Sequence, residues 1–253
     1  MKKDNLDFIK DKKFKKKLWN PIGKAMHDYN MIQENDRIAV GISGGKDSIT
    51  LLNSLVRVKE ISNVNFTIIP IHIQTDMKED SYNKIKEYCK DLGLELYIKK
   101  TDIKDIVFGK DNSNENNTKN PCFLCSRMRR GILYKIMQEE NLNKLALGHH
   151  KDDIIETFLM NVIYQGNMNI MKARYFSQEY NVNIIRPLAY VEESDIEKYI
   201  EHYSLPIIKS NCPYDGDKNS IRKKVKNLIG LLSEEKTDVR STIFNSIKNF
   251  KEI

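Results

Sequence analysis

The sequence lacks any uninterrupted apolar run long enough to cross a bilayer. Its lysine-rich beginning is not followed by the apolar segment that an export signal needs. We therefore expect a cytoplasmic protein with no part in a membrane, and we find no internal repeat. At 253 residues, of which 40% are hydrophobic, the chain can bury a full core. Its length suits one domain with an appendage or two small domains.

Acidic residues are scarce in one part of the chain, its first 24 residues. This segment holds nine lysines against three aspartates, which accounts for nearly all of the formal net charge of +7. A basic segment of this kind is usually a solvated helix face. The alternative interpretation is a surface that binds nucleic acid.

A Walker phosphate loop is also absent, although a related turn follows the apolar strand expected at Arg37–Ile42. The turn reads Ser43-Gly44-Gly45-Lys46-Asp47-Ser48. Val40 stands where the Walker motif has its first glycine, and Asp47 follows the lysine directly. Kinase or GTPase chemistry is therefore not indicated.

The same turn nevertheless predicts a nucleotide site. A strand that continues as a helix leaves backbone N–H groups unpaired at the helix start, where the helix dipole favours phosphate. The adjacent Gly44 and Gly45 let the backbone approach an anion closely. The segment resembles the pyrophosphate loop, or PP-loop, of enzymes that split ATP between its α- and β-phosphates and so adenylate an oxygen. An ordinary glycine-rich turn is the alternative.

Apolar periodicity predicts alternating strands and helices, which is typical of an α/β fold with a doubly wound parallel sheet. The expected strands are Arg37–Ile42, Phe66–Ile73, Leu94–Ile98, Lys144–Leu147 and Ile184–Leu188. The expected helices are Asp47–Lys59, Ser81–Leu92, Ser126–Glu140, Asp152–Tyr164, Asn219–Leu232 and Thr237–Phe250. A helical stripe of Phe14, Leu18, Ile22 and Met26 precedes them. We expect a basic helical extension at 1–32, an ATP-binding PP-loop domain at 33–205 and a C-terminal helical segment at 206–253.

Ligands of doubly wound sheets bind at the carboxyl ends of the strands. That rule places Ser43–Ser48, His72–Asp76 and Gly148–Asp153 around one crevice. The expected ATP-binding residues are Gly41, Ser43, Gly44, Gly45, Lys46, Asp47, Ser48, His72, Gly148 and His149. His149 and His150 have a second interpretation as packing or capping residues.

Carboxylates in this crevice are candidates for holding magnesium, because Mg²⁺ prefers carboxylate and phosphate oxygens. We expect Asp47 and Asp153 to bind it, with Asp152 as the second choice. Lys46, Asp47 and Asp153 are accordingly the expected catalytic residues. The alternative for Asp152 and Asp153 is that they are ordinary first-turn acids of a helix.

Cysteines are few, and the chain has no second Cys-x-x-Cys beside the pair Cys122 and Cys125. A zinc ribbon is therefore poorly supported. Cys212 could join the pair, because three thiolates suit an iron–sulfur cluster in which one iron stays open. A thiol redox pair is the alternative. Cys89 lies in an expected helix and should be buried.

Three motifs together resemble one family: Ser43–Ser48, then Pro121-Cys122-Phe123-Leu124-Cys125-Ser126-Arg127-Met128-Arg129-Arg130-Gly131, then Gly148-His149-His150-Lys151-Asp152-Asp153. They are similar to the tRNA 2-thiocytidine synthetases, that is, the tRNA-cytidine 2-sulfurtransferases. The resemblance runs from about Trp19 to Lys226 and includes Ile185-Arg186-Pro187-Leu188. It implies the adenine nucleotide alpha-hydrolase fold of PP-loop type.

The resemblance also implies the chemistry. The family uses ATP, Mg²⁺ and a three-cysteine [4Fe-4S] cluster to replace the 2-oxygen of an anticodon-loop cytidine, cytidine 32, with sulfur. Carried onto this chain, it makes Cys122, Cys125 and Cys212 the expected cluster ligands. The implied partners are tRNA and a sulfide donor such as a cysteine desulfurase, and a homodimer is left open.

One departure keeps the target base open. The third cysteine stands in Ser210-Asn211-Cys212-Pro213-Tyr214, which is closer to the sister 2-thiouridine synthetases, whereas Gly148-His149-His150 fits the cytidine enzymes better. A 2-thiouridine synthetase is thus the nearest alternative. A lysidine synthetase, which does not need the three cysteines, is a further alternative. From other classes of protein, the alternatives are an ATP-dependent enzyme that inserts sulfur into a molecule other than tRNA and a redox-sensing nucleotide-binding protein that catalyses no reaction.

An RNA substrate requires positive charge near the crevice. The expected RNA-binding residues are Lys13, Lys16, Lys17, Arg127, Arg129, Arg130, Lys223 and Lys224. The last two belong to a basic cluster that also contains Lys218, Arg222 and Lys226. Arg129 and Arg130 are adjacent on an expected helix and cannot face the same way.

Overall fold

The computed structural model describes residues 7–75, 82–108, 121–208, 220–236 and 238–249. A six-stranded sheet in the order β3-β2-β1-β4-β6-β5 forms its centre. The strands are β1 (Asp36–Gly41), β2 (Phe66–Gln74), β3 (Tyr97–Lys100), β4 (Lys144–Ala146), β5 (Arg174–Ser177) and β6 (Val182–Ile185). All neighbours pair in parallel except β5, which is antiparallel to β6. The predicted α/β class and doubly wound sheet are confirmed, and β5 is an antiparallel edge strand that was not predicted.

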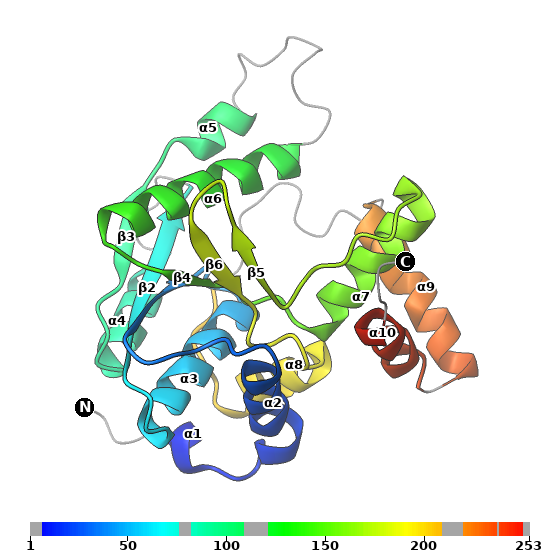
Figure 1. Cartoon of the computed structure of the whole chain (residues 1–253), viewed down its shortest axis with the longest axis horizontal. Coiled ribbons are helices and arrows are strands. Elements are labelled where there is room, and N and C mark those ends of the chain that lie inside the picture. The colour runs from blue at the N-terminus through cyan, green and yellow to red at the C-terminus, as the bar shows by residue number, and fades with distance from the viewer. Residues whose placement is uncertain (1–6, 76–81, 109–120, 209–219, 237, 250–253) are drawn as a thin grey trace.

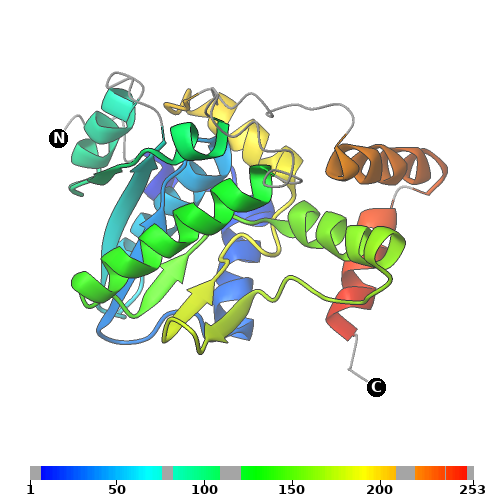
Figure 2. The same cartoon turned by 90° about the horizontal axis from the view of Figure 1, so that it is seen from above.

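Helices cover both faces of the sheet (Figures 1 and 2). The helices are α1 (Asp7–Lys10), α2 (Asn20–Asp28), α3 (Lys46–Ile61), α4 (Asn83–Asp91), α5 (Ile103–Phe108), α6 (Pro121–Glu139), α7 (Lys151–Met160), α8 (Glu193–His202), α9 (Ile221–Glu235) and α10 (Val239–Asn249). Two π-helical turns, η2 (Lys15–Trp19) and η5 (Asn161–Gln165), adjoin α2 and α7. No helix in these ranges combines the length and apolar character that a membrane span needs.

Alternation along the strands divides the interior into two cores. On β1, Ile38 and Val40 join the core beneath α3 and α8, whereas Ala39 joins the core beneath α5 and α6. Ile184 and Ile185 of β6 divide in the same way. Because both faces are covered, apolar residues predominate in the central strands, as in parallel strands generally, although β1 begins with Asp36 and β4 with Lys144.

The predicted N-terminal stripe is buried against the first of these cores. Phe14, Leu18, Ile22 and Met26 are all at most 8% exposed. Phe14 packs edge-on against Tyr199 of α8, with ring centroids 5.3 Å apart. The basic segment is therefore anchored to the sheet domain on its apolar side.

Helices α9 and α10 pack together beside α7, at one side of the sheet (Figure 1). Val225 and Ile229 of α9 and Phe244 and Ile247 of α10 are buried there and belong to the core beneath α3. The domain limits at residues 32 and 205 stay a prediction.

Several element limits differ from those predicted. The helix expected from Ser126 begins at Pro121, so that Cys122 and Cys125 lie on it. The third strand is Tyr97–Lys100, three residues later than expected, and the last parallel strand ends at Ile185, before Pro187. Proline cannot donate to a strand ladder, which explains that end.

Candidate functional site

The loop between β1 and α3 is shaped by Gly44. This residue has a positive φ of 86°, a conformation that side chains disfavour. Its carbonyl accepts a hydrogen bond from the Ile208 N–H at 2.8 Å. A Cβ at Gly44 would lie 2.9 Å from Ile208 Cδ1. Only glycine therefore allows the loop to adopt this turn beneath Ile208.

Two serines hold the loop from inside. Ser48 Oγ accepts the Gly44 N–H at 3.2 Å and donates to the Gly45 carbonyl at 2.9 Å. Ser43 Oγ donates to Ser48 Oγ at 3.2 Å and accepts the Gly45 N–H at 3.3 Å. Both hydroxyls predicted to bind phosphate thus also brace the loop backbone.

Helix α3 begins directly after this loop. Its N-cap is Gly45, so no side chain caps the helix start. The N–H groups of a first turn without a side-chain cap, together with the helix dipole, favour an anion. The geometry is that of a phosphate-binding loop.

The loop after β4 touches this loop at the backbone. A Cβ at Gly148 would lie 3.0 Å from the Asp47 carbonyl carbon and 3.2 Å from the Ser48 nitrogen. Strands β1 and β4 are neighbours, and the chain continues from β1 toward β2 on the other side. The two loops therefore meet at the topological switch point of the sheet, the place where such folds bind ligands.

Lys46 extends from the start of α3 into a network of charges. Its Nζ donates to Glu193 Oε1 at 3.0 Å and lies 3.5 Å from Asp47 Oδ1. Burial alone would lower the pKa of Lys46, but Asp47 and Glu193 raise it above its usual value. Lys226 of α9 donates to the other oxygen of Glu193. Burial alone would raise the pKa of Glu193, but hydrogen bonds from Lys226 and Lys46 lower it to about 2.

Asp47 has a carboxylate oxygen that could bind a metal cation. Its Oδ1 is buried and has no hydrogen-bond partner in the described part of the chain. Burial raises the pKa of Asp47 despite the nearby charges of Lys46 and His150. Lys46 Nζ lies 3.5 Å from this oxygen and His150 Nε2 lies 3.8 Å from it. A buried carboxylate oxygen that accepts no hydrogen bond can also bind a cation such as Mg²⁺.

Asp153, the second predicted magnesium ligand, is engaged at both oxygens. Its Oδ2 accepts the His150 N–H at 3.1 Å, and its Oδ1 accepts from Arg222 Nη1 of α9 at 2.7 Å. The His150 Nε2 lies 3.4 Å from Asp153 and 3.8 Å from Asp47, so the histidine stands between the two acids. The ring charge and the backbone hydrogen bond of His150 lower the pKa of Asp153, which burial alone would raise.

Asp152, the second choice as a magnesium ligand, forms hydrogen bonds between helices. It accepts the Glu193 N–H at 2.8 Å and the Arg240 Nε at 3.2 Å, which joins α7 to the start of α8 and to α10. Within the described ranges, no three or more His, Cys, Asp or Glu side chains are arranged to hold a metal ion.

The two other crevice histidines are held differently. The His72 Nδ1–H donates to the Ile42 carbonyl at 2.8 Å, so this buried ring braces the strand end that carries the loop. His149 Nδ1 accepts from Arg186 Nε at 3.1 Å. Burial and the Arg186 charge lower the pKa of His149 to about 4.

Cys122 and Cys125 lie at the start of α6, three residues apart and so on one side of the helix. Cys122 is exposed and Cys125 is half-buried. Cys212, the third predicted cluster ligand, lies outside the described residues. Cys89 is buried as expected, and burial raises the pKa of its thiol to about 12.

The predicted RNA-binding residues lie in three separate places. Those of the N-terminal segment, Lys13, Lys16 and Lys17, are exposed. Lys13 and Lys17 line a groove along α8 with a volume of about 560 Å³, where Lys13 donates to His202 at 2.9 Å. The groove also contains the acids Asp195 and Glu201.

The other two sets are on different helices. Arg127 and Arg130 are exposed on α6, across the sheet from α8, while Arg129 is half-buried, in line with the expectation that neighbours face different ways. Lys223 and Lys224 are exposed on α9, and Lys218 lies outside the described residues.

Three functional positions were missed or misinterpreted. Arg222 and Lys226 looked like part of an RNA-facing cluster, but both pair with acids of the crevice. Glu193 was not singled out, although it is a first-turn acid of α8. Its partner Lys46 is 147 residues away in the sequence, so no local signal identifies the pair.

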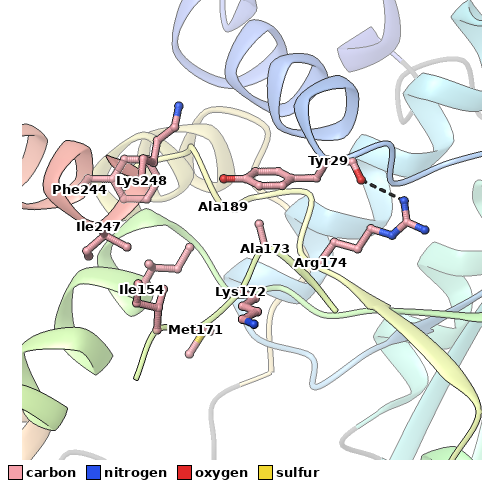
Figure 3. Close-up of a pocket in the computed structure, with 11 residues that line it drawn as sticks. Tyr29, Ile154, Met171, Lys172, Ala173, Arg174, Ala189, Phe244, Ile247 and Lys248 are labelled. Atoms are coloured by element: carbon pink, nitrogen blue, oxygen red, sulfur yellow. Dashed lines mark hydrogen bonds between the residues drawn. The ribbon is translucent and has the colours of Figure 1, made fainter. Parts of the chain in front are cut away.

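A cavity of about 230 Å³ lies away from the predicted site residues, between α7, α10, the residue that follows α2 and the segment before β5 (Figure 3). Ile154, Phe244 and Ile247 form part of its apolar lining. Arg174 lies at its edge and donates to the Tyr29 carbonyl at 3.1 Å. None of the predicted site residues contributes to this cavity.

Comparison with known proteins agrees with this geometry. Residues 10–229 match the family described as the PP-loop domain. Curated relatives named tRNA-cytidine(32) 2-sulfurtransferase include a protein of Geotalea uraniireducens, 35% identical over 95% of this chain and 94% of its own. Another, from Coxiella burnetii, is 37% identical over 96% of this chain and 93% of its own. The solved U34-tRNA thiolase NcsA from Methanococcus maripaludis, with its [4Fe-4S] cluster, matches with a TM-score of 0.71 and 25% identity, covering 92% of this chain and 79% of that one.

Proposed function

The chain belongs to the tRNA-cytidine(32) 2-sulfurtransferase family of PP-loop proteins, and from that premise we propose that it thiolates cytidine 32 of tRNA after ATP-driven adenylation of the 2-oxygen. The observation that carries the ATP step is the meeting of two loops at the switch point. The helix start without a side-chain cap and the Asp47 oxygen without a hydrogen bond both lie where these loops meet. That pairing suits a polyphosphate with its cation.

The residues of the crevice have different roles in adenylation. The backbone of the Ser43–Ser48 loop binds the β- and γ-phosphates, and the Lys46 ammonium and the hydroxyls of Ser43 and Ser48 offset their charge. Asp47 and Asp153 would hold Mg²⁺, which would offset the negative charge of the phosphates. His150, between the two acids, and Arg222 orient Asp153. Gly41, His72 and His149 line the nucleotide.

The cysteine pair on α6 supplies the second half of the site. Cys122 and Cys125, with Cys212, would hold a [4Fe-4S] cluster that supplies sulfide through its open iron. Two cysteines on one side of the start of α6, one of them exposed, are a suitable part of such a ligand set. The NcsA relative carries a [4Fe-4S] cluster, which supports this assignment. A cysteine desulfurase or another sulfide donor supplies the sulfur.

A uridine target is the second candidate. It is favoured by the match to a U34-tRNA thiolase at a TM-score of 0.71. The curated relatives, at higher sequence identity and similar coverage, favour cytidine. We therefore place cytidine first.

A purified reaction tests the proposal. Anaerobically prepared protein, unmodified tRNA, ATP, Mg²⁺ and sulfide should yield AMP and tRNA that contains 2-thiocytidine. Asp47→Asn should abolish AMP formation, since it removes a charged oxygen beside the phosphates. Asp105→Asn, at an acid of α5 for which we propose no role, is the matched control. ADP in place of AMP would contradict adenylation, and zinc in place of iron in the protein would contradict the cluster.

A further inference from the structure

Arg186 makes a buried contact with His149 that adenylation as described above does not use. The arginine directly follows β6 and is 7% exposed. Its Nε donates to His149 Nδ1 at 3.1 Å, and its Nη1 donates to the Lys172 carbonyl at 2.5 Å. The guanidinium carbon also lies 5.4 Å from the ring centroid of Tyr175. Contacts on three sides fix the direction in which the guanidinium points.

This contact determines the tautomer of His149. A guanidinium has donors and no acceptor, so His149 Nδ1 must present its lone pair to Arg186. A neutral imidazole with an unprotonated Nδ1 carries its proton on Nε2. In the described part of the chain, Nε2 has no hydrogen-bond partner of its own. The ring therefore holds one N–H donor available for a ligand.

His149 has neighbours on the phosphate loop and, through Arg186, on the helix that carries the cysteine pair. It follows Gly148, at which a Cβ would lie 3.0 Å from the Asp47 backbone of the phosphate loop. Its partner Arg186 is within electrostatic range of Tyr134 and Arg130. Both belong to α6, the helix that carries the cysteine pair. A donor next to the phosphate loop is suitably placed for an oxygen of a bound substrate.

We propose that Arg186 is a positioning residue that fixes His149 as the Nε2–H tautomer, so that His149 serves as a neutral hydrogen-bond donor to a phosphoryl or carbonyl oxygen. The tautomer is a property of this chain alone, whereas the role of the donor rests on the proposed function. A fixed donor aimed at an oxygen that gains negative charge stabilises the transition state without giving up its proton. His149 thus does not act as a base.

The charges around His149 agree with a neutral ring. Burial, Arg186, Arg222 of α9 and the neighbouring His150 all lower its pKa, and Asp153 of α7 raises it. The lowering effects prevail, and the pKa lies at about 4. The ring is therefore neutral at the pH of the cell.

Nitrogen NMR of the full-length protein with ¹⁵N-labelled histidine tests the tautomer directly. The chain has five histidines, and His149→Gln identifies the signals of the missing ring. Wild-type protein at neutral pH should have a protonated Nε2 and an unprotonated Nδ1 at His149. The opposite tautomer in the wild type would overturn the proposal, and this measurement needs no arginine variant to fold.

Variants at position 186 test the cause. Arg186→Met should give a mixture of tautomers at His149, and Arg186→Lys, which keeps a donor, should restore part of the Nε2–H form. Arg174→Met is the matched control, because Arg174 also donates to backbone carbonyls but points toward Tyr29 (Figure 3). Its His149 signals should match the wild type. An unchanged His149 in Arg186→Met would refute the role of Arg186.

Thiolation activity of two variants shows whether His149 acts as a hydrogen-bond donor or as a base. His149→Gln keeps an N–H donor and cannot act as a base near neutral pH, so it should retain thiolation within about tenfold of the wild type. His149→Ala should lose about 10²-fold in kcat, the usual effect of removing one such donor. Equal losses in the two variants would contradict the donor role. If wild-type protein performs no thiolation, the proposed function fails while the NMR result still decides the tautomer.

Discussion

Replacing Gly148 by alanine tests the contact between the two loops of the crevice. The new Cβ would lie 3.0 Å from the Asp47 carbonyl carbon, 3.1 Å from its oxygen and 3.2 Å from the Ser48 nitrogen, whereas ordinary contact begins at 3.4 Å. All three atoms are backbone at the start of α3, so no side chain can rotate away. The loops must separate by a few tenths of an ångström, at a cost of about 1–3 kcal/mol, the usual range for overpacking.

That cost should divide between stability and ligand binding. A loss of about 1.4 kcal/mol in the phosphate loop corresponds to a tenfold rise in the Kd for ATP. The remainder should lower the Tm by about 2–4 °C per kcal/mol for a chain of this size. Urea unfolding measures the loss of stability, and equilibrium binding of ATP measures the rise in Kd.

Gly131→Ala is the matched control for this substitution. Gly131 lies inside α6, and a Cβ there meets nothing within 4 Å. The change should stabilise the protein by about 0.5–1 kcal/mol, because alanine favours a helix over glycine. ATP affinity should stay at the wild-type value. A Gly148→Ala protein with wild-type stability and wild-type ATP affinity would refute the close approach of the two loops.

Three further changes test other parts of the account. Lys144→Met removes the partner of Asp36 from an ion pair of 2.6 Å whose side chains are 2% and 3% exposed. The change should destabilise the protein by about 3–5 kcal/mol in urea unfolding, because it leaves a buried charge unpaired. A loss below about 1 kcal/mol would contradict the buried pair. The folded-state pKa of Glu193 is lowered to about 2, so its contribution to stability is present above its ordinary value of 4.5 and is lost as the pH falls toward 2. Glu193→Gln should therefore weaken the pH dependence of stability in that window, and an unchanged pH profile would argue against the Lys46–Glu193–Lys226 contacts. The double variant Lys16→Ala, Lys17→Ala should reduce the slope of log K against log salt for tRNA binding by up to about 2, if each lysine neutralises one phosphate. Lys59→Ala on α3 is the control and should keep the wild-type slope. A wild-type slope in the double variant would show that η2 does not contact RNA.

The phosphate loop could be predicted from the sequence because its signals are local. An apolar strand, two glycines and a helix start occupy consecutive positions, and Gly44 has the positive φ that only such a residue adopts readily. The grouping of Ser43–Ser48 with Gly148–Asp153 followed from the rule for parallel sheets. The contact between Gly148 and Asp47 bears out that grouping.

The partners of the charged residues could not be predicted in the same way. Arg222 binds Asp153 from 69 residues away, and an exposed basic helix face looks alike whether it meets RNA or buried acids. The start of α6 was missed for a different reason. Proline is favoured in the first turn of a helix, so Pro121 could have marked the start that was placed at Ser126. The short edge strand Arg174–Ser177 depends on pairing with β6, which no local pattern specifies.

Nucleoside analysis of tRNA from cells that lack this protein tests the central claim most directly. The account predicts that 2-thiocytidine disappears, returns with the wild-type gene and does not return with the Asp47→Asn variant, while 2-thiouridine stays constant. Unchanged 2-thiocytidine, or a loss of 2-thiouridine in its place, would contradict the account.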